Sequence, residues 1–168
     1  MKMDLTAERG WCDGIRRVDR WVLVCSILLL MVSQAASAQK SVTAQSMERQ
    51  GMVDVTTLDS TIHVSLMYAR PDNFTGRILY ADLREALLHP RAARALCEAQ
   101  RLLKKRRPDL SLKIYDATRP MSVQAQMWQV VVGTPQQNYV SNPRNGGGLH
   151  NYGMAVDVTL CDAQSGDT

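Results

Sequence analysis

The chain has 168 residues and a formal net charge of +4 at pH 7. Beyond residue 38, where a leader is predicted to end, 130 residues carry 15 Lys and Arg against 12 Asp and Glu. That length suits one domain with one core rather than several domains. So small an excess of positive charge gives no reason to expect a nucleic-acid partner.

The first 38 residues have the pattern of an export signal. Five Lys and Arg lie within residues 1–20, an apolar run covers residues 21–32, and Ala36-Ser37-Ala38 has the small side chains that signal peptidase recognises. The apolar run is shorter than the about 20 residues of a membrane span, although the long, mixed-charge region before it keeps an N-terminal anchor as the alternative. We expect a signal peptide over residues 1–38 and a periplasmic or secreted protein with no stable membrane partner after cleavage.

The middle of the chain predicts scaffold elements. Residues 39–50 are polar and are expected to be a linker, which places the folded domain at residues 51–168. Apolar alternation predicts short strands at 53–55 and 62–68, with a turn at 57–60 between them. Residues 73–76 are expected to form a turn in which Phe74, the single Phe of the chain, anchors the core.

Two helices are predicted next, over residues 81–88 and 90–107. Pro90 is a natural first residue of the second helix, and the basic residues 104–107 suit a helix C-terminus, where cations interact favourably with the helix dipole. Helical spacing predicts an apolar stripe along this helix, formed by Ala92, Leu96, Ala99 and Leu103.

Residues 111–116 are predicted to form a strand, followed by a sharp turn and a helix over residues 122–132. Pro120 favours extended geometry at Arg119 and suits the start of the helix. Arg119 therefore lies at a strand end, where its guanidinium could stabilise the oxyanion of a tetrahedral intermediate. From these residues alone, a surface ion pair between Arg119 and Asp116 is the simpler interpretation.

The last third of the chain contains the most informative pattern. A long loop over residues 133–148, expected to be a mobile rim, leads to His150, and residues 154–160 alternate like a half-buried strand. Aspartate is rare in strands, so Asp157 suggests a carboxylate kept for its chemistry. Gly153 can bend the chain so that His150 folds back toward Asp157. Such a pair supplies two of the three protein ligands of a hydrolytic zinc site, although a lone His and Asp at this spacing also arise by chance.

Three segments resemble the zinc D,D-peptidases, a group that includes the D-alanyl-D-alanine dipeptidases. His150, Gly153, Ala155 and Asp157 match the motif Ser-x-His-x-x-Gly-x-Ala-x-Asp. The segment from Asp116 to Pro120 resembles the block Asp-Ala-x-Arg-Pro, and residues 68–80 are similar to the Asn-Phe-x-Gly-x-x-x-Tyr region of the dipeptidase branch.

The resemblance implies a fold, a cofactor and a role for each site residue. The element order already suggests an α+β domain with a small mixed or antiparallel sheet and flanking helices, which is also what the resemblance implies. It further implies that His150 and Asp157 bind one Zn²⁺ and that Arg119 stabilises the transition state.

Two features depart from the family pattern. The Ser of the motif is Gly148 here, so a hydroxyl that could bind substrate is lost. The family takes its third zinc ligand, a His, and its general base, a Glu, from a segment downstream of the Asp, and residues 158–168 contain neither. His63 and His89 have no motif that would make them substitutes. We therefore expect the last strands and the catalytic segment of the family to be missing from these 168 residues, and this chain to show little or no turnover.

The sequence thus predicts an exported zinc dipeptidase that hydrolyses D-Ala-D-Ala to two D-Ala in cell-wall precursor turnover. A D,D-carboxypeptidase or another peptidoglycan peptidase on the same scaffold is the nearer alternative. The second alternative is an inactive fragment that at most binds peptide. The oligomeric state is not indicated by the sequence.

Overall fold

A computed structural model describes residues 39–168, and residues 1–38, with the predicted leader, lie outside the described part. Its strands are β1 (Val53–Asp54), β2 (His63–Val64), β3 (Leu87–Leu88), β4 (Leu110–Asp116) and β5 (Asp157–Asp162). Its α-helices are α2 (Val42–Arg49), α3 (Val55–Leu58), α4 (Pro90–Arg106) and α5 (Met121–Val131). Short 3₁₀ helices are η1 (Met67–Ala69), η2 (Pro135–Tyr139), η3 (Pro143–Asn145) and η4 (Leu149–Tyr152).

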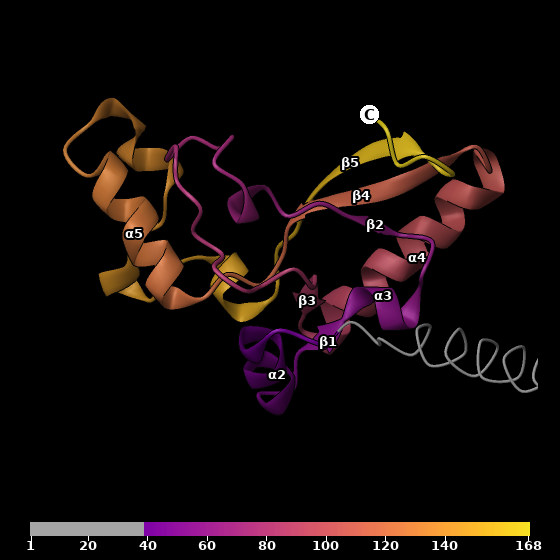
Figure 1. Ribbon diagram of the computed structural model, residues 1–168, viewed down its shortest axis with the longest axis horizontal. Helices are drawn as coiled ribbons and strands as arrows, with labels where there is room; N and C mark the ends of the chain where they lie inside the picture. Colours follow the sequence, from indigo (N-terminus) through magenta and orange to yellow (C-terminus); the bar gives the residue numbers. More distant parts are fainter. Residues whose placement is uncertain (1–38) are drawn as a thin grey trace, which may run out of the picture. The chain divides into compact units, whose positions relative to one another are not determined.

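The strands form two small sheets. Strand β1 pairs with β3 in an antiparallel ribbon, while β4 is the centre of a three-stranded sheet, parallel to β2 and antiparallel to β5. Helix α4 packs against β4, β3 and α3, and Figure 1 shows α4 running alongside β4 and α5 lying beyond the carboxyl end of that strand. The predicted α+β class with a small mixed sheet is confirmed.

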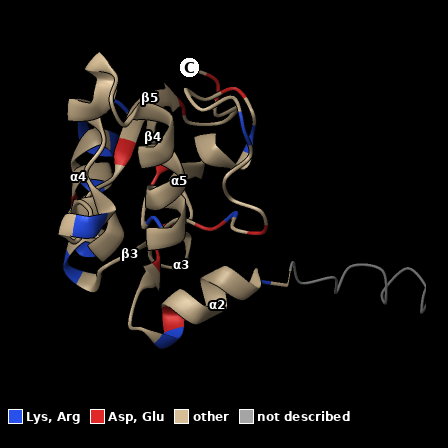
Figure 2. Cartoon of the chain, turned by 90° about the vertical axis from the view of Figure 1, so that its left-hand side faces the viewer, with Lys and Arg blue, Asp and Glu red and all other residues tan. Residues whose placement is uncertain are grey.

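Helix α4 begins and ends as its sequence predicts, but its buried face differs. His89 caps it, Pro90 is its first residue, and Lys and Arg are frequent along it up to the basic last turn (Figure 2). The buried side chains are Ala93, Leu96 and Gln100, so the predicted apolar stripe is only partly correct. The last of the three, Gln100, is polar, and it is tolerated there because the core satisfies its hydrogen bonds.

Gln100 links helix α4 to strand β4. Its Nε2 donates to Thr61 Oγ1 and to Ser111 Oγ, each at 2.8 Å, and its Oε1 accepts from the Leu112 backbone N–H at 3.0 Å. Every polar atom of the amide is thus paired in a place that water does not reach. A satisfied polar group costs little to bury, whereas the same group without partners would destabilise the fold.

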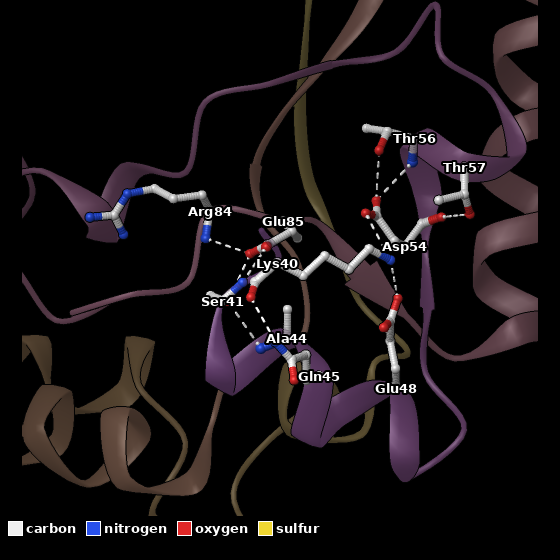
Figure 3. Close-up of polar contacts among 10 residues, drawn as sticks. All are labelled: Lys40, Ser41, Ala44, Gln45, Glu48, Asp54, Thr56, Thr57, Arg84 and Glu85. Carbon is white, nitrogen blue, oxygen red and sulfur yellow. Dashed lines mark hydrogen bonds and ion pairs between the residues drawn. The ribbon is translucent and has the colours of Figure 1, made fainter. Parts of the chain in front are cut away.

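Two predictions at the N-terminal side of the domain are wrong for one shared reason. Residues 42–49, expected within a linker, form helix α2, and residues 81–88, expected as a helix, are irregular and end in β3. Figure 3 shows the contact that decides both: the Glu85 carboxylate accepts from the Ser41 N–H at 2.8 Å and from Ser41 Oγ at 2.9 Å. Ser41 in turn caps α2, whose Ala44 and Met47 are buried. These long-range contacts outweigh the local preferences of both segments.

Other differences concern short strands and single side chains. The strand predicted at 62–68 is reduced to β2 and is followed by η1. The strand predicted at 53–55 ends at Asp54, which caps helix α3. Strand β5 begins at Asp157 rather than at residue 154, and its Val158 and Leu160 are exposed while Cys161 is buried. Phe74 is 52% exposed and is not a core anchor.

Two further findings concern the described residues. Cys97 and Cys161, between which export would permit a disulfide, are both free thiols. None of the helices within residues 39–168 is both long enough and apolar enough to cross a membrane.

The buried amide of Gln100 makes a testable prediction. The substitution Gln100→Leu should lower the free energy of unfolding by about 2–4 kcal/mol, because it leaves the Leu112 N–H without a buried partner. Chemical denaturation of the purified chain measures this. The matched control Gln129→Leu, at an exposed position of helix α5, should change stability by no more than about 0.5 kcal/mol. Equal effects of the two substitutions would contradict this role.

Candidate functional site

The site is organised around Asp116, at the carboxyl end of β4. This side chain is 1% exposed, and its Oδ1 accepts from the Tyr80 hydroxyl at 2.5 Å. Its Oδ2 accepts from Arg119 Nη2 at 2.5 Å and from Arg119 Nε at 3.1 Å. Burial and the adjacent carboxylate both raise the pKa of Tyr80, so its hydroxyl stays a donor.

Arg119 forms an ion pair with Asp116, as the local sequence predicts. The pair does not lie on the surface, because the Arg119 side chain is only 11% exposed. Burial opposes its charge, and Asp116 more than compensates, so the pKa of Arg119 is raised. Its Nη1 donates to Gln124 Oε1 at 2.8 Å, and its Cζ lies 5.2 Å from the centre of the Tyr68 ring. The guanidinium is held on three sides, and the bonds to Asp116 and Gln124 use three of its five N–H donors.

His150 reaches the site because the chain turns sharply after it. It lies in η4, and Gly153 ends this turn at φ 65°, in the left-handed region that favours glycine. A Cβ at Gly153 would come within 2.6 Å of the His89 backbone nitrogen, so the close packing of the chain also requires glycine there. The backbone carbonyl of His150 accepts from the Arg119 N–H at 3.0 Å. The predicted bend at Gly153 is therefore present, and it places His150 beside the strand end.

The two nitrogens of His150 have different partners. Nδ1 lies 2.9 Å from the Ala117 carbonyl oxygen, which can only accept, so Nδ1 carries the proton. Nε2 then points at Asp157, with its nitrogen 3.5 Å from Asp157 Oδ1. Burial lowers the pKa of His150, but the contacts with Asp157, Ala117 and Asp116 outweigh it and the net shift is upward. The contact with His150, which is attractive when the imidazole is protonated, lowers the pKa of Asp157.

Asp157 is placed by the register of the sheet. It is the first residue of β5 and lies opposite Asp116 on β4, after an irregularity in the pairing. The separation of His150 Nε2 and Asp157 Oδ1 suits a shared zinc ion, since two ligands of a tetrahedral zinc lie about 3.4 Å apart at ordinary bond lengths. A ligating His commonly donates its other N–H to a backbone carbonyl, as Nδ1 does here. The donor set thus fits a metal.

Asp116 comes close enough to be counted with these ligands, because one ligand atom of each of the three residues lies within 4.8 Å of the others. Both of its oxygens already accept short hydrogen bonds, however, so we interpret it as the group that holds Arg119 rather than as a ligand. His63 lies near the Ala163 carbonyl and His89 caps α4. Neither joins the cluster.

Arg119, His150 and Asp157 line one cavity of about 260 Å³. Its wall includes two residues that the sequence assigned to scaffold, Tyr68 and Phe74, whose rings meet edge to face with centroids 6.2 Å apart. Residues 68–80 carry the family resemblance that points to them, although the local pattern predicts only a turn with Phe74 as a core anchor. Gln124 and Ser141 also line the cavity, and no sequence pattern indicated either.

Two comparisons with known proteins identify the family to which this chain is similar. The family model Peptidase_M15, described as D-ala-D-ala dipeptidase, matches residues 48–168. The chain is also similar to the D-alanyl-D-alanine dipeptidase of Escherichia coli (strain K12), with 37% identity over 111 residues. That alignment covers 66% of this chain and 54% of the relative, so the chain spans about half the length of the curated relative it matches.

The contact between Tyr80 and Asp116 can be tested by deleting one oxygen atom. Tyr80→Phe should lower the free energy of unfolding by about 1–3 kcal/mol, because a buried carboxylate loses a hydrogen-bond donor. The matched control is Tyr115→Phe, since the Tyr115 hydroxyl makes no hydrogen bond within residues 39–168. Thermal or chemical denaturation measures both, and a Tyr80→Phe protein as stable as the control would show that Asp116 does not depend on this donor.

Proposed function

The chain belongs to the M15 family of D-Ala-D-Ala dipeptidases, and from this we propose that the protein hydrolyses the dipeptide D-Ala-D-Ala to two D-Ala with a bound zinc ion. Turnover of cell-wall precursors is the proposed physiological role. The observation that carries the proposal is the pairing of His150 Nε2 with Asp157 Oδ1, 3.5 Å apart, in the cavity that also contains Arg119.

We assign His150 and Asp157 as two of the zinc ligands. The Ala117 carbonyl fixes the tautomer of His150 and leaves Nε2 as the coordinating atom, and the lowered pKa of Asp157 keeps its carboxylate ionised at neutral pH. When bound, zinc supplies Lewis acidity for peptide hydrolysis. The two residues therefore provide a neutral donor and an anionic donor at the same point of the cavity.

We assign Arg119 as the residue that stabilises negative charge on the substrate. Hydrolysis of a peptide bond places negative charge on the carbonyl oxygen, and a preorganised cation stabilises that charge without having to reorganise during the reaction. Arg119 meets this requirement because Asp116 and Gln124 fix its plane. Two of its five N–H donors remain for the ligand.

The size of the cavity favours a small substrate. Pockets for drug-sized ligands measure about 300–1,000 Å³, and this one is about 260 Å³. A cavity of this size has room for a dipeptide, and the resemblance of residues 68–80 to the dipeptidase branch favours the dipeptidase over the D,D-carboxypeptidase alternative. Export through residues 1–38 to the periplasm or the exterior is part of the proposal and rests on the leader pattern alone.

The metal assignment predicts the behaviour of two variants. His150→Ala and Asp157→Ala should each weaken zinc binding at least tenfold, because each removes a ligand atom. Loss of a residue that only hydrogen-bonds a ligand already lowers metal affinity by about 10–100-fold. Competition with a chromogenic zinc chelator measures the affinity. The matched control His63→Ala should bind zinc like the unaltered chain. If all three variants bind zinc equally, the ion is held elsewhere and the assignment is wrong.

The activity itself is tested by comparing two substrates. The sequence predicts little or no turnover by these 168 residues, because neither a third His ligand nor a Glu base is identified in them. Any release of D-Ala by the purified zinc-loaded protein should be faster from free D-Ala-D-Ala than from a pentapeptide that ends in D-Ala-D-Ala, and Arg119→Ala should lower it by about 10²–10³-fold, as loss of an oxyanion-stabilising donor does. Arg94→Ala, at an exposed site of helix α4, should leave kcat unchanged. Faster release from the pentapeptide would favour the carboxypeptidase alternative, and binding without release from either would favour a non-catalytic peptide binder.

A further inference from the structure

The wall of the cavity contains a pair of residues that compete for one space. Gly148 has an extended backbone, with φ −129° and ψ −178°, which any residue can adopt. A side chain there would crowd its neighbour instead, because a Cβ at this position would lie 2.6 Å from Ser141 Oγ and 3.2 Å from Ser141 Cβ, so the Ser141 hydroxyl would have to move away. With Ser141 in its present orientation, the space between positions 141 and 148 therefore holds only one side chain. In this chain that side chain is the one of Ser141.

Ser141 is held in this place through the residues that hold Arg119. Its carbonyl oxygen accepts from Gln124 Nε2 at 2.7 Å, and Gln124, which is fully buried, accepts from Arg119 through its Oε1. The facing residue is fixed from the same arginine, since the Gly148 N–H donates to Asn151 Oδ1 at 2.8 Å and Asn151 Nδ2 donates to the Arg119 carbonyl at 2.9 Å. Both sides of the contact are thus tied to the backbone or side chain of Arg119.

The Ser141 hydroxyl is free to bind a ligand. Ser141 lines the same cavity as Arg119, His150 and Asp157, and its Oγ makes no hydrogen bond to any residue between 39 and 168. A hydroxyl both donates and accepts, so it can bind the carboxylate or the amide of a short peptide. Ser141 therefore offers an unpaired hydroxyl to a ligand that occupies this cavity.

We propose that Ser141 is a substrate-binding residue, whose hydroxyl hydrogen-bonds the bound dipeptide from the place that a side chain at residue 148 would otherwise occupy. Gln124 is its positioning residue. The inference rests on the proposed function, because it takes the ligand of the cavity to be a dipeptide. It adds that the loop over residues 133–148, and not the segment next to His150, supplies the hydroxyl.

Four variants of the zinc-loaded chain test the proposal by their affinity for D-Ala-D-Ala, measured by calorimetry or by NMR titration. Ser141→Ala should weaken binding about three- to tenfold, which corresponds to one hydrogen bond. Gly148→Ala should weaken it to a similar degree, because the new methyl group displaces the hydroxyl. The double variant Ser141→Ala with Gly148→Ala should be no weaker than either single one, since both remove the same interaction.

The fourth variant moves the hydroxyl across the contact. Ser141→Gly combined with Gly148→Ser should recover most of the affinity that Ser141→Ala loses, because one side chain again occupies the shared space. The matched control Ser122→Ala, at an exposed position of helix α5, should bind like the unaltered chain. A thermal scan provides a readout that is independent of binding. Gly148→Ala should lower Tm by about 2–4 °C, and adding Ser141→Gly to that variant should restore most of the lost Tm.

The outcomes separate this inference from the proposed function. If the unaltered chain binds D-Ala-D-Ala and Ser141→Ala binds it equally well, Ser141 is not a substrate-binding residue while the proposed function stands. Additive losses in the double variant would also overturn the inference, because the two positions would then act separately. If the unaltered chain does not bind the dipeptide, the proposed function and the inference built on it both fail.

Discussion

The arrangement of this site depends on one buried carboxylate. Asp116 is nearly inaccessible to water, and an ionised group in such a place is tolerated only when it is paired and hydrogen-bonded. Tyr80 and Arg119 satisfy that requirement. The same pairing fixes the guanidinium at the end of β4. The ion pair that compensates the buried charge of Asp116 therefore also positions the cation of Arg119 in the cavity. Breaking such a pair costs far more than its net contribution to stability, because it leaves a buried charge alone.

The rest of the site is built outward from this pair by backbone contacts. The carbonyl of His150 accepts from the Arg119 N–H, and its ring donates to the carbonyl of Ala117, so the histidine is docked onto the segment that follows Asp116. The sheet register sets Asp157 opposite Asp116. The loop that leads to His150 is tied to the same arginine through Gln124. Groups from four separate segments thus meet at one strand end.

The sequence was a good guide to this site wherever local geometry decides. Gly153 predicted the bend that brings His150 to Asp157, and Pro120 predicted the turn that exposes Arg119 at a strand end. It was a poor guide where distant contacts decide. Residues 42–49 are polar, yet they form a helix because Glu85, more than thirty residues away, binds the residue that caps it. Similarly, nothing local marks Gln100 as a core residue or Phe74 as part of a cavity wall.

If His150 and Asp157 bind the same metal ion, as we propose, locating the ion in the protein will show it. A crystal structure of the zinc-loaded protein, with anomalous data collected on both sides of the zinc edge, identifies the metal and its ligands together. We expect one anomalous peak within about 2.0–2.2 Å of both His150 Nε2 and Asp157 Oδ1. A zinc peak away from these two atoms, or one that touches only one of them, would contradict it.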